Sequence, residues 1–184
     1  MKKMLPMVLS ALSLLVIAQG NAQAEDVAAT LAINGNVTQS MTQSCTMYLK
    51  NSAVGLLDDV ATMVNQGENY KSGASIDVSI GASSNTEACK KMADEGKLAY
   101  KFMGIADNAD GTVLANTDTS AAAAKGIGVG VFDSASKKLL KINEDTMLTK
   151  SWVNTFTVAM VKLNGQTPSV GAVKSSLTIQ FERL

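Results

Sequence analysis

The segment at residues 30–37 reads Thr-Leu-Ala-Ile-Asn-Gly-Asn-Val, and it decides how the rest of the chain must be interpreted. Every second residue falls on one mostly apolar face, while the residues between are mostly polar. Alternation with a period of two predicts a β-strand with one buried face. A strand of this kind near the start of a mature chain must join a sheet, either in its own chain or in another. The residues of the apolar face are Ala29, Leu31, Ile33, Gly35 and Val37.

Residues 1–24 have the three parts of a secretory signal peptide. Two lysines follow the first methionine, residues 7–18 form an apolar core too short to span a bilayer, and Ala22-Gln23-Ala24 fits the small-x-small cleavage rule. We therefore expect an exported protein whose mature chain begins at Glu25. No later segment is apolar enough for a membrane span, so we expect no membrane insertion.

The composition argues against several classes of function. The chain has 16 basic and 16 acidic residues and no basic block, so we expect no nucleic-acid partner. It has no histidine, which removes the commonest general base and the commonest metal ligand. We predict no metal site, no cofactor and no enzymatic activity, and a small exported hydrolase is the least favoured alternative.

The two cysteines, Cys45 and Cys89, predict a structural disulfide, because the chain is exported. A bridge that closes a loop of this length contributes about 4 kcal/mol to stability in the chain-entropy description. The wide spacing is unlike the Cys-x-x-Cys arrangement of redox-active pairs.

Short alternating segments recur through the rest of the chain, separated by stretches rich in Gly, Asn and Ser that are typical of turns. Many short strands joined in this way predict an all-β sandwich. Residues 54–64 are ambiguous, because their apolar residues have near-helical spacing, and there we predict a strand with a helical turn. The predicted strands lie around residues 76–80, 98–102, 127–131, 156–160 and 177–181.

Three short motifs have simpler interpretations than their spelling suggests. Residues 126–130 alternate glycine with apolar residues, and a glycine-bearing strand is favoured over a nucleotide-binding loop. Residues 134–137 match Ser-x-x-Lys, but the partner Lys-Thr-Gly is missing, and we expect a hairpin turn at residues 133–134. Asp107 and Asp110 lack the glutamate of a calcium loop, so a plain turn is favoured.

Taken together, these features resemble the fimbrial subunits (pilins) that bacteria assemble by the chaperone–usher pathway, of the type 1 kind. The resemblance covers the whole mature chain. Residues 26–37 are similar to the N-terminal extension of the family, and Cys45 and Cys89 fall where its disulfide lies. Residues 99–104 and 126–133 resemble core strands, and residues 165–168, Gly171 and residues 177–181 resemble the closing segment.

The resemblance implies an incomplete immunoglobulin-like β-sandwich, completed by a donor strand from a neighbouring subunit. Residues 25–38 would be the donor extension and residues 39–184 the pilin domain. The donor side chains would be Ala29, Leu31, Ile33, Gly35 and Val37.

The family also implies two further partners, a periplasmic chaperone and an outer-membrane usher. The chaperone would fill the open groove with its own strand, and the usher would exchange that strand for the next subunit. The product would be a head-to-tail polymer, a fimbrium on the bacterial surface that supports adhesion. The residues expected to meet the chaperone are Leu177, Ile179, Phe181 and the carboxylate of Leu184.

Two features leave alternatives open. The family usually has a penultimate tyrosine, whereas here the penultimate residue is Arg183. Gly35 marks either a narrow place in the acceptor groove or a turn after Asn34, because Asn-Gly is also a hairpin signal.

The alternative function is a single-domain adhesin that binds a host glycan or receptor. Sugar sites usually contain aromatic platforms, and the available residues are Trp152, Tyr48, Tyr70 and Tyr100.

Overall fold

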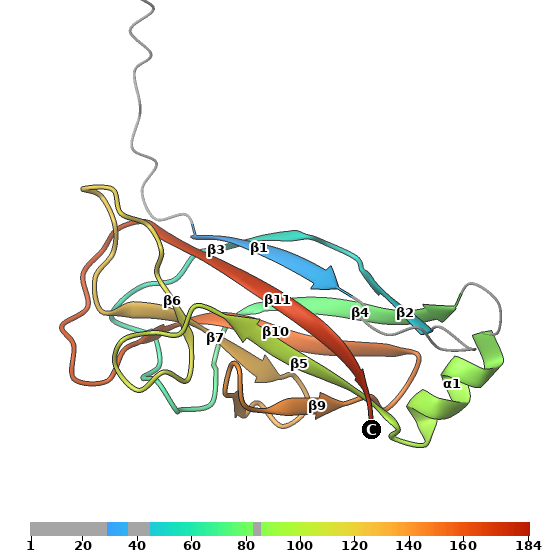
Figure 1. Ribbon diagram of the computed structural model, residues 1–184. Helices are drawn as coiled ribbons and strands as arrows, with labels where there is room; N and C mark the ends of the chain where they lie inside the picture. The colour runs from blue at the N-terminus through green and yellow to red at the C-terminus, as the bar shows by residue number, and fades with distance from the viewer. Residues whose placement is uncertain (1–28, 37–44, 83–85) are drawn as a thin grey trace, which may run out of the picture.

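The computed structural model describes residues 29–36, 45–82 and 86–184, and it shows two β-sheets packed face to face (Figure 1). One sheet has the strand order β3-β1-β11-β5-β9, and the other has the order β2-β4-β10-β7-β6, with β8 paired to β7. The strands are β1 (Ala29–Asn36), β2 (Cys45–Leu49), β3 (Ala53–Leu56), β4 (Ala74–Ala82), β5 (Leu98–Gly104), β6 (Leu114–Ala115), β7 (Ile127–Asp133), β8 (Leu139–Leu140), β9 (Thr146–Leu148), β10 (Val153–Lys162) and β11 (Val173–Arg183). The all-β sandwich of two sheets expected from the sequence is confirmed.

The strands predicted from alternation are also confirmed, as β4, β5, β7, β10 and β11. In β11 the alternation is complete, since every second residue from Val173 to Phe181 is buried. The inward residues of the two sheets meet in one core, where the rings of Phe102 and Phe156 lie 5.0 Å apart. Burial of these apolar side chains between two sheets is the main force that stabilises such a sandwich.

Residues 54–64 form a strand and then a helical turn, as predicted. The strand is β3, and the turn follows at Asp59, whose carbonyl oxygen accepts hydrogen bonds from the amides of Thr62 (3.0 Å) and Met63 (2.9 Å). The Asp59 side chain accepts a further hydrogen bond from the Ala61 amide at 2.8 Å. Met63 is buried, so the near-helical spacing reflects one turn that returns the chain to the core.

The helix α1 (Thr86–Asp94) was not expected from the sequence. It is short and mostly polar, and its two buried residues, Cys89 and Ala93, lie four positions apart on one face. The helix is closed at its C-terminal end by Gly96, which has a φ of 67° and whose amide donates to the Ala93 carbonyl oxygen at 3.0 Å. A glycine in this conformation is a common helix cap.

The three short motifs adopt their simpler interpretations. Residues 127–130 belong to the start of β7, with Gly126 directly before it, and β7 and β8 form a hairpin whose turn begins at Asp133. The Asp107 carboxylate accepts hydrogen bonds from the amides of Ala109 (2.7 Å) and Val113 (3.1 Å), so it closes its own loop. Within the described ranges, no helix is long and apolar enough to cross a membrane.

Candidate functional site

The candidate site is the position of β1 within its sheet, between β3 and β11 (Figure 1). β1 runs parallel to β11, with Ala29 opposite Val173 and Asn36 opposite Gln180. It runs antiparallel to β3, with Ala29 opposite Leu56. Because β3 and β11 are joined in the sheet only through β1, its removal would leave an unpaired edge on each of them.

Burial within β1 follows the predicted alternation at the two positions whose side chains are described. Leu31 is 1% exposed and belongs to the main core, whereas its neighbour Ala32 is exposed. The backbone register places Ile33 opposite Leu177 and Gly35 opposite Ile179. Burial of a whole leucine side chain stabilises a fold by about 1.5–3 kcal/mol, so Leu31 alone contributes substantially to keeping β1 in the sheet. Val37 lies outside the described residues, as do residues 1–28, with the predicted signal peptide.

β11 forms the wall of this site on one side. Leu177 and Ile179 are fully buried, and the ring of Phe181 lies 5.4 Å from that of Tyr100. Leu184 is placed differently from these three, since it is 63% exposed and its amide donates to the Lys97 carbonyl oxygen at 2.9 Å. The structure therefore brings three of the four predicted contact residues onto one inner face, with Leu184 beyond the end of the strand.

The first residues of β11 are held independently of β1 by the loop after β6. The Lys174 amide donates to Asn116 Oδ1 at 2.9 Å, and the Thr117 amide donates to the Lys174 carbonyl oxygen at 2.7 Å. Lys174 Nζ lies 3.0 Å from Asp118 Oδ2. The hydrogen bond that the Ser120 amide donates to the Asp118 carboxylate is the largest cause that lowers its pKa. The hydrogen bond from the Lys174 side chain is the second, and the pKa of Asp118 falls to about 2. The role of this loop was not predicted from the sequence. Its Asn-Thr-Asp segment is a turn signal, but a turn signal does not indicate which distant residues the loop contacts.

Gly171 lies where the same loop crosses the chain just before β11. Its φ is 151°, and a Cβ placed there would lie 2.5 Å from the Ala124 backbone nitrogen and 2.7 Å from the Ala123 carbonyl carbon. Neither backbone atom can move aside as a flexible side chain would. The residue must therefore be glycine for the loop to approach β11 this closely.

The predicted disulfide is present. Cys45 and Cys89 are joined with an S–S distance of 2.03 Å, and both are buried. The bridge ties the first residue of β2 to α1, so the chain is anchored at the point where it continues after residues 37–44. Among the described residues, β1 has no comparable covalent hold and is attached through sheet pairing and burial.

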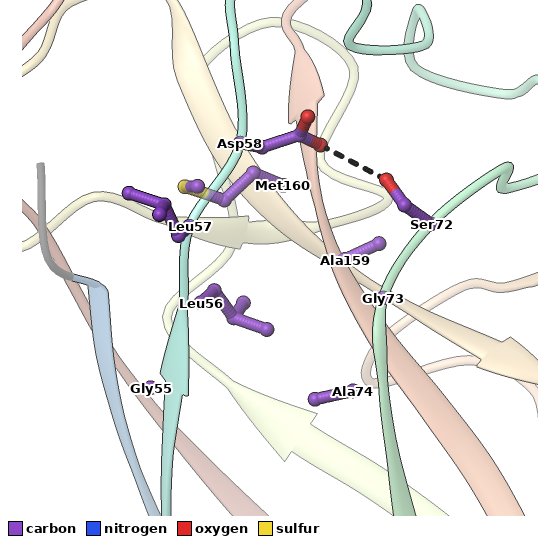
Figure 2. A pocket seen from close by; sticks show the side chains of 9 residues that line it. All are labelled: Gly55, Leu56, Leu57, Asp58, Ser72, Gly73, Ala74, Ala159 and Met160. Atoms are coloured by element: carbon purple, nitrogen blue, oxygen red, sulfur yellow. Dashed lines mark hydrogen bonds between the residues drawn. The ribbon is translucent and has the colours of Figure 1, made fainter.

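A pocket of about 690 Å³ is bounded in part by Val173, the residue of β11 that lies opposite Ala29 in the register. Its walls include Ile127, Met160 and Val173, which are buried core residues, and Gly171. A smaller pocket of about 260 Å³ adjoins it and shares Leu57. Figure 2 shows this second pocket between the end of β3 and the start of β4, with Asp58 and Ser72 pointing toward each other across its rim.

The aromatic residues named for an adhesin do not form one platform. Tyr100 is fully buried, where the Asn154 side chain donates to its hydroxyl at 3.3 Å. Tyr70 packs on Phe132 with ring centroids 5.2 Å apart, and Trp152 packs partly on the core. Tyr48, at 57% exposure, is the one tyrosine of the three that is mostly open to solvent. In the described part of the chain, no group of three or more Cys, Asp or Glu residues is arranged to hold a metal ion.

Residues 31–182 match the protein family described as Fimbrial protein. Among solved structures, the crystal structure of the P pilus rod subunit PapA is similar, with a TM-score of 0.48 and 11% sequence identity, covering 80% of this chain and 97% of that one. No curated protein sequence matches the chain significantly.

Proposed function

The chain belongs to the fimbrial protein family and is therefore a structural pilus subunit rather than an enzyme, and we propose that it polymerises by exchanging β1 between copies. In the closed chain β1 fills its own place in the sheet. In the polymer, β1 of one subunit would fill that place in the next subunit, whose own β1 would in turn be donated onward. This head-to-tail contact does not close on itself, so it generates a filament.

The observation that carries this proposal is that β1, the first strand of the described residues, lies inside a sheet between β3 and β11. A strand that comes first in the order of strands can be exchanged between copies without changing the connections among the strands that follow it. Here residues 37–44 separate β1 from Cys45, where the disulfide begins the covalently fixed part of the fold. The start of the site that β1 leaves has a second support, since the loop after β6 bonds the first residues of β11 from the other side.

The expected partners follow from what an empty site would expose. Without β1, the buried side chains of Leu177 and Ile179 would face water along an unpaired strand, which is a state prone to aggregation. We infer that a periplasmic chaperone covers this groove with a strand of its own before assembly and that an outer-membrane usher directs the exchange. The subunit would then be exported through the periplasm into a fimbrium on the cell surface.

A pair of matched variants tests the proposal. Leu31→Asp places a charge on the buried face of β1, and Ala32→Asp places the same charge on the exposed face one residue later. Cells expressing the Leu31→Asp subunit should form no fimbriae visible by electron microscopy, whereas the Ala32→Asp subunit should assemble as the wild type does. Equal assembly by both variants would refute a role for the buried face of β1 in polymerisation.

Deletion of residues 25–38 gives a second test. The truncated subunit should not polymerise, and it should be stable only when a chaperone or a synthetic peptide with the β1 sequence is present. A truncated protein that stays monomeric and unfolds cooperatively at high temperature without any such addition would overturn the proposal, because the fold would then be complete without β1.

A further inference from the structure

A third pocket opens between the turn after β7 and the chain that runs from β9 into β10. Its volume is about 340 Å³, and small-molecule sites span roughly 300–1,000 Å³. None of its lining residues belongs to β1, β3 or β11, and none is an aromatic residue named for an adhesin. The residues that matter for its chemistry are Asp133, Leu148, Lys150, Ser151, Val153 and Thr155.

Two opposite charges in this lining lie close together without direct contact. Lys150 Nζ is 3.9 Å from Asp133 Oδ2, which is longer than a hydrogen bond. The lysine side chain is mostly exposed, whereas the aspartate side chain is mostly buried. A hydroxyl group can lie about 2.8 Å from both atoms at once, accepting a hydrogen bond from the ammonium group and donating one to the carboxylate. Because the two charges cancel, the pocket suits an uncharged ligand that carries hydroxyl groups.

The same pocket also has apolar surface that is open to water. Leu148 and Val153 both line it, and they are 47% and 48% exposed. A sugar ring has hydroxyl groups at its edge and C–H groups on its faces, and a C–H face is stabilised when it covers apolar surface. The charge pair and the two apolar side chains therefore match the two kinds of surface that a sugar presents.

The backbone around the two charged residues is fixed by hydrogen bonds. The Lys150 amide donates to Asn154 Oδ1 at 2.9 Å, and Asn154 Nδ2 donates to the Ser151 carbonyl oxygen at 2.8 Å. Asn154 is itself buried. On the other side, Asp133 Oδ1 accepts from the Ala135 amide at 2.8 Å, which leaves Oδ2 as the carboxylate oxygen nearest the lysine. A site fixed in this way loses little conformational freedom when a ligand binds.

We propose that this pocket binds one uncharged sugar residue, such as the end of a glycan chain. A sugar hydroxyl group bridges Lys150 Nζ and Asp133 Oδ2, and the C–H face of the ring packs on Leu148 and Val153. Because the pocket contains no residue of β1, the sugar site does not depend on the proposed strand exchange.

An NMR titration of the purified mature subunit tests the site. The probes are the methyl glycosides of glucose, galactose, mannose and N-acetylglucosamine, added one at a time while the amide signals of Leu148, Lys150 and Val153 are followed. At least one glycoside should shift these signals to saturation. Glycine, which carries both charges but no hydroxyl group, should not. If no glycoside shifts the signals, or if glycine alone does, the proposal is overturned.

Three variants test the residues assigned to the site. Asp133→Asn keeps an oxygen to accept from the Ala135 amide but replaces Oδ2 with a hydrogen-bond donor, and Lys150→Met removes the ammonium group. Each should weaken binding of the glycoside by about tenfold. Lys138→Met removes the same charge from an exposed residue outside the pocket and should leave binding unchanged.

Unchanged affinity in both Asp133→Asn and Lys150→Met would overturn the assignment, and so would equal weakening by Lys138→Met, which would point to net charge alone. If Asp133→Asn does not fold, Lys150→Met decides the question, because its side chain is mostly exposed and its loss should leave the fold intact.

Discussion

Leu31 of β1 lies directly opposite Ser175 of β11, and both residues are buried, with 1% and 4% exposure. The serine hydroxyl donates to the Ala115 carbonyl oxygen at 2.7 Å, so its polar group is satisfied away from β1. A large side chain is thus matched to a small one across the two strands. Further along, the order is reversed, because Gly35 lies opposite Ile179.

Ser175→Leu should therefore obstruct the site that receives β1. The added side chain would compete with Leu31 for the same space, and overpacking of a filled core typically costs about 1–3 kcal/mol. We expect a lower urea midpoint for the closed monomer and slower uptake of a β1 peptide. Ser176→Leu adds the same volume on the exposed face of β11 and serves as the control. Identical midpoints for the two variants would contradict the size match.

The strands of the sandwich could be predicted because their signal is local. Each buried strand alternates within its own few residues, as β11 does between Val173 and Phe181. The helical turn at Asp59 was predictable for the same reason. By contrast, α1 spans nine residues and buries only Cys89 and Ala93, so its apolar face is too short to identify a helix from the sequence.

The site itself could be predicted only in part. Alternation identified the apolar face of β1, but nothing in residues 29–36 specifies a parallel partner more than a hundred residues away. The hydrogen bond that the Lys174 amide donates to Asn116 Oδ1 spans 58 residues, and its donor in β11 is a backbone atom, which leaves no trace in side-chain identity. Gly171 could be noticed in the sequence, but the backbone atoms that require it could not.

Gly171→Ala should destabilise the fold strongly. The new methyl group would meet the backbone of Ala123 and Ala124, and the positive φ disfavours any residue with a Cβ. We expect a loss of more than about 2 kcal/mol in the free energy of unfolding, measured by urea titration.

Gly165→Ala is the control for Gly171→Ala, because Gly165 also has a positive φ, 71°, but no neighbouring atom lies within 4 Å of the position that a Cβ would take there. It should lose roughly 1 kcal/mol, from backbone strain alone. If both variants lost the same stability, close approach of the loop would not be the reason for glycine at position 171.

Removal of the disulfide should lower stability without changing the fold. Replacing Cys45 and Cys89 together by serine frees the start of β2 from α1, and the loss of such a bridge typically costs about 2–4 kcal/mol. We expect a lower melting temperature and reduced periplasmic accumulation with the chaperone present. Wild-type abundance and an unchanged melting temperature would argue against a structural role for the bridge.

The Asp118 carboxylate should make stability depend on acid pH. Its pKa in the folded protein, about 2, lies below the usual value for aspartate, because the Ser120 amide and Lys174 favour the charged form. A group with a lowered pKa stabilises the fold above its unfolded pKa, and that contribution is lost as the pH falls toward 2.

Asp118→Asn should consequently be less stable than the wild type at neutral pH, with a difference that shrinks as the pH approaches about 2. Urea midpoints across this range measure the effect. A gap between Asp118→Asn and the wild type that is constant with pH would assign the loss to packing instead of charge.

Gly35 offers the most specific test of the strand-exchange proposal. In the closed chain β1 continues through Gly35 to Asn36, so the Asn34-Gly35 pair forms part of a strand there rather than a turn. Its partner in the register, Ile179, is fully buried. A glycine opposite such a residue is expected where the two strands leave no space for a second side chain.

A peptide spanning residues 26–38 should displace the chaperone from the bound subunit, and the same peptide with Gly35→Leu should do so about tenfold more slowly, from overpacking against Ile179. The matched peptide Asn36→Leu carries its leucine on the opposite face and should react at the wild-type rate. Chaperone release is followed by fluorescence anisotropy. Slowing by both leucine peptides to the same degree would show that added bulk alone, and not the fit at Ile179, limits the exchange, and failure of all three peptides to displace the chaperone would reject β1 as the donated strand.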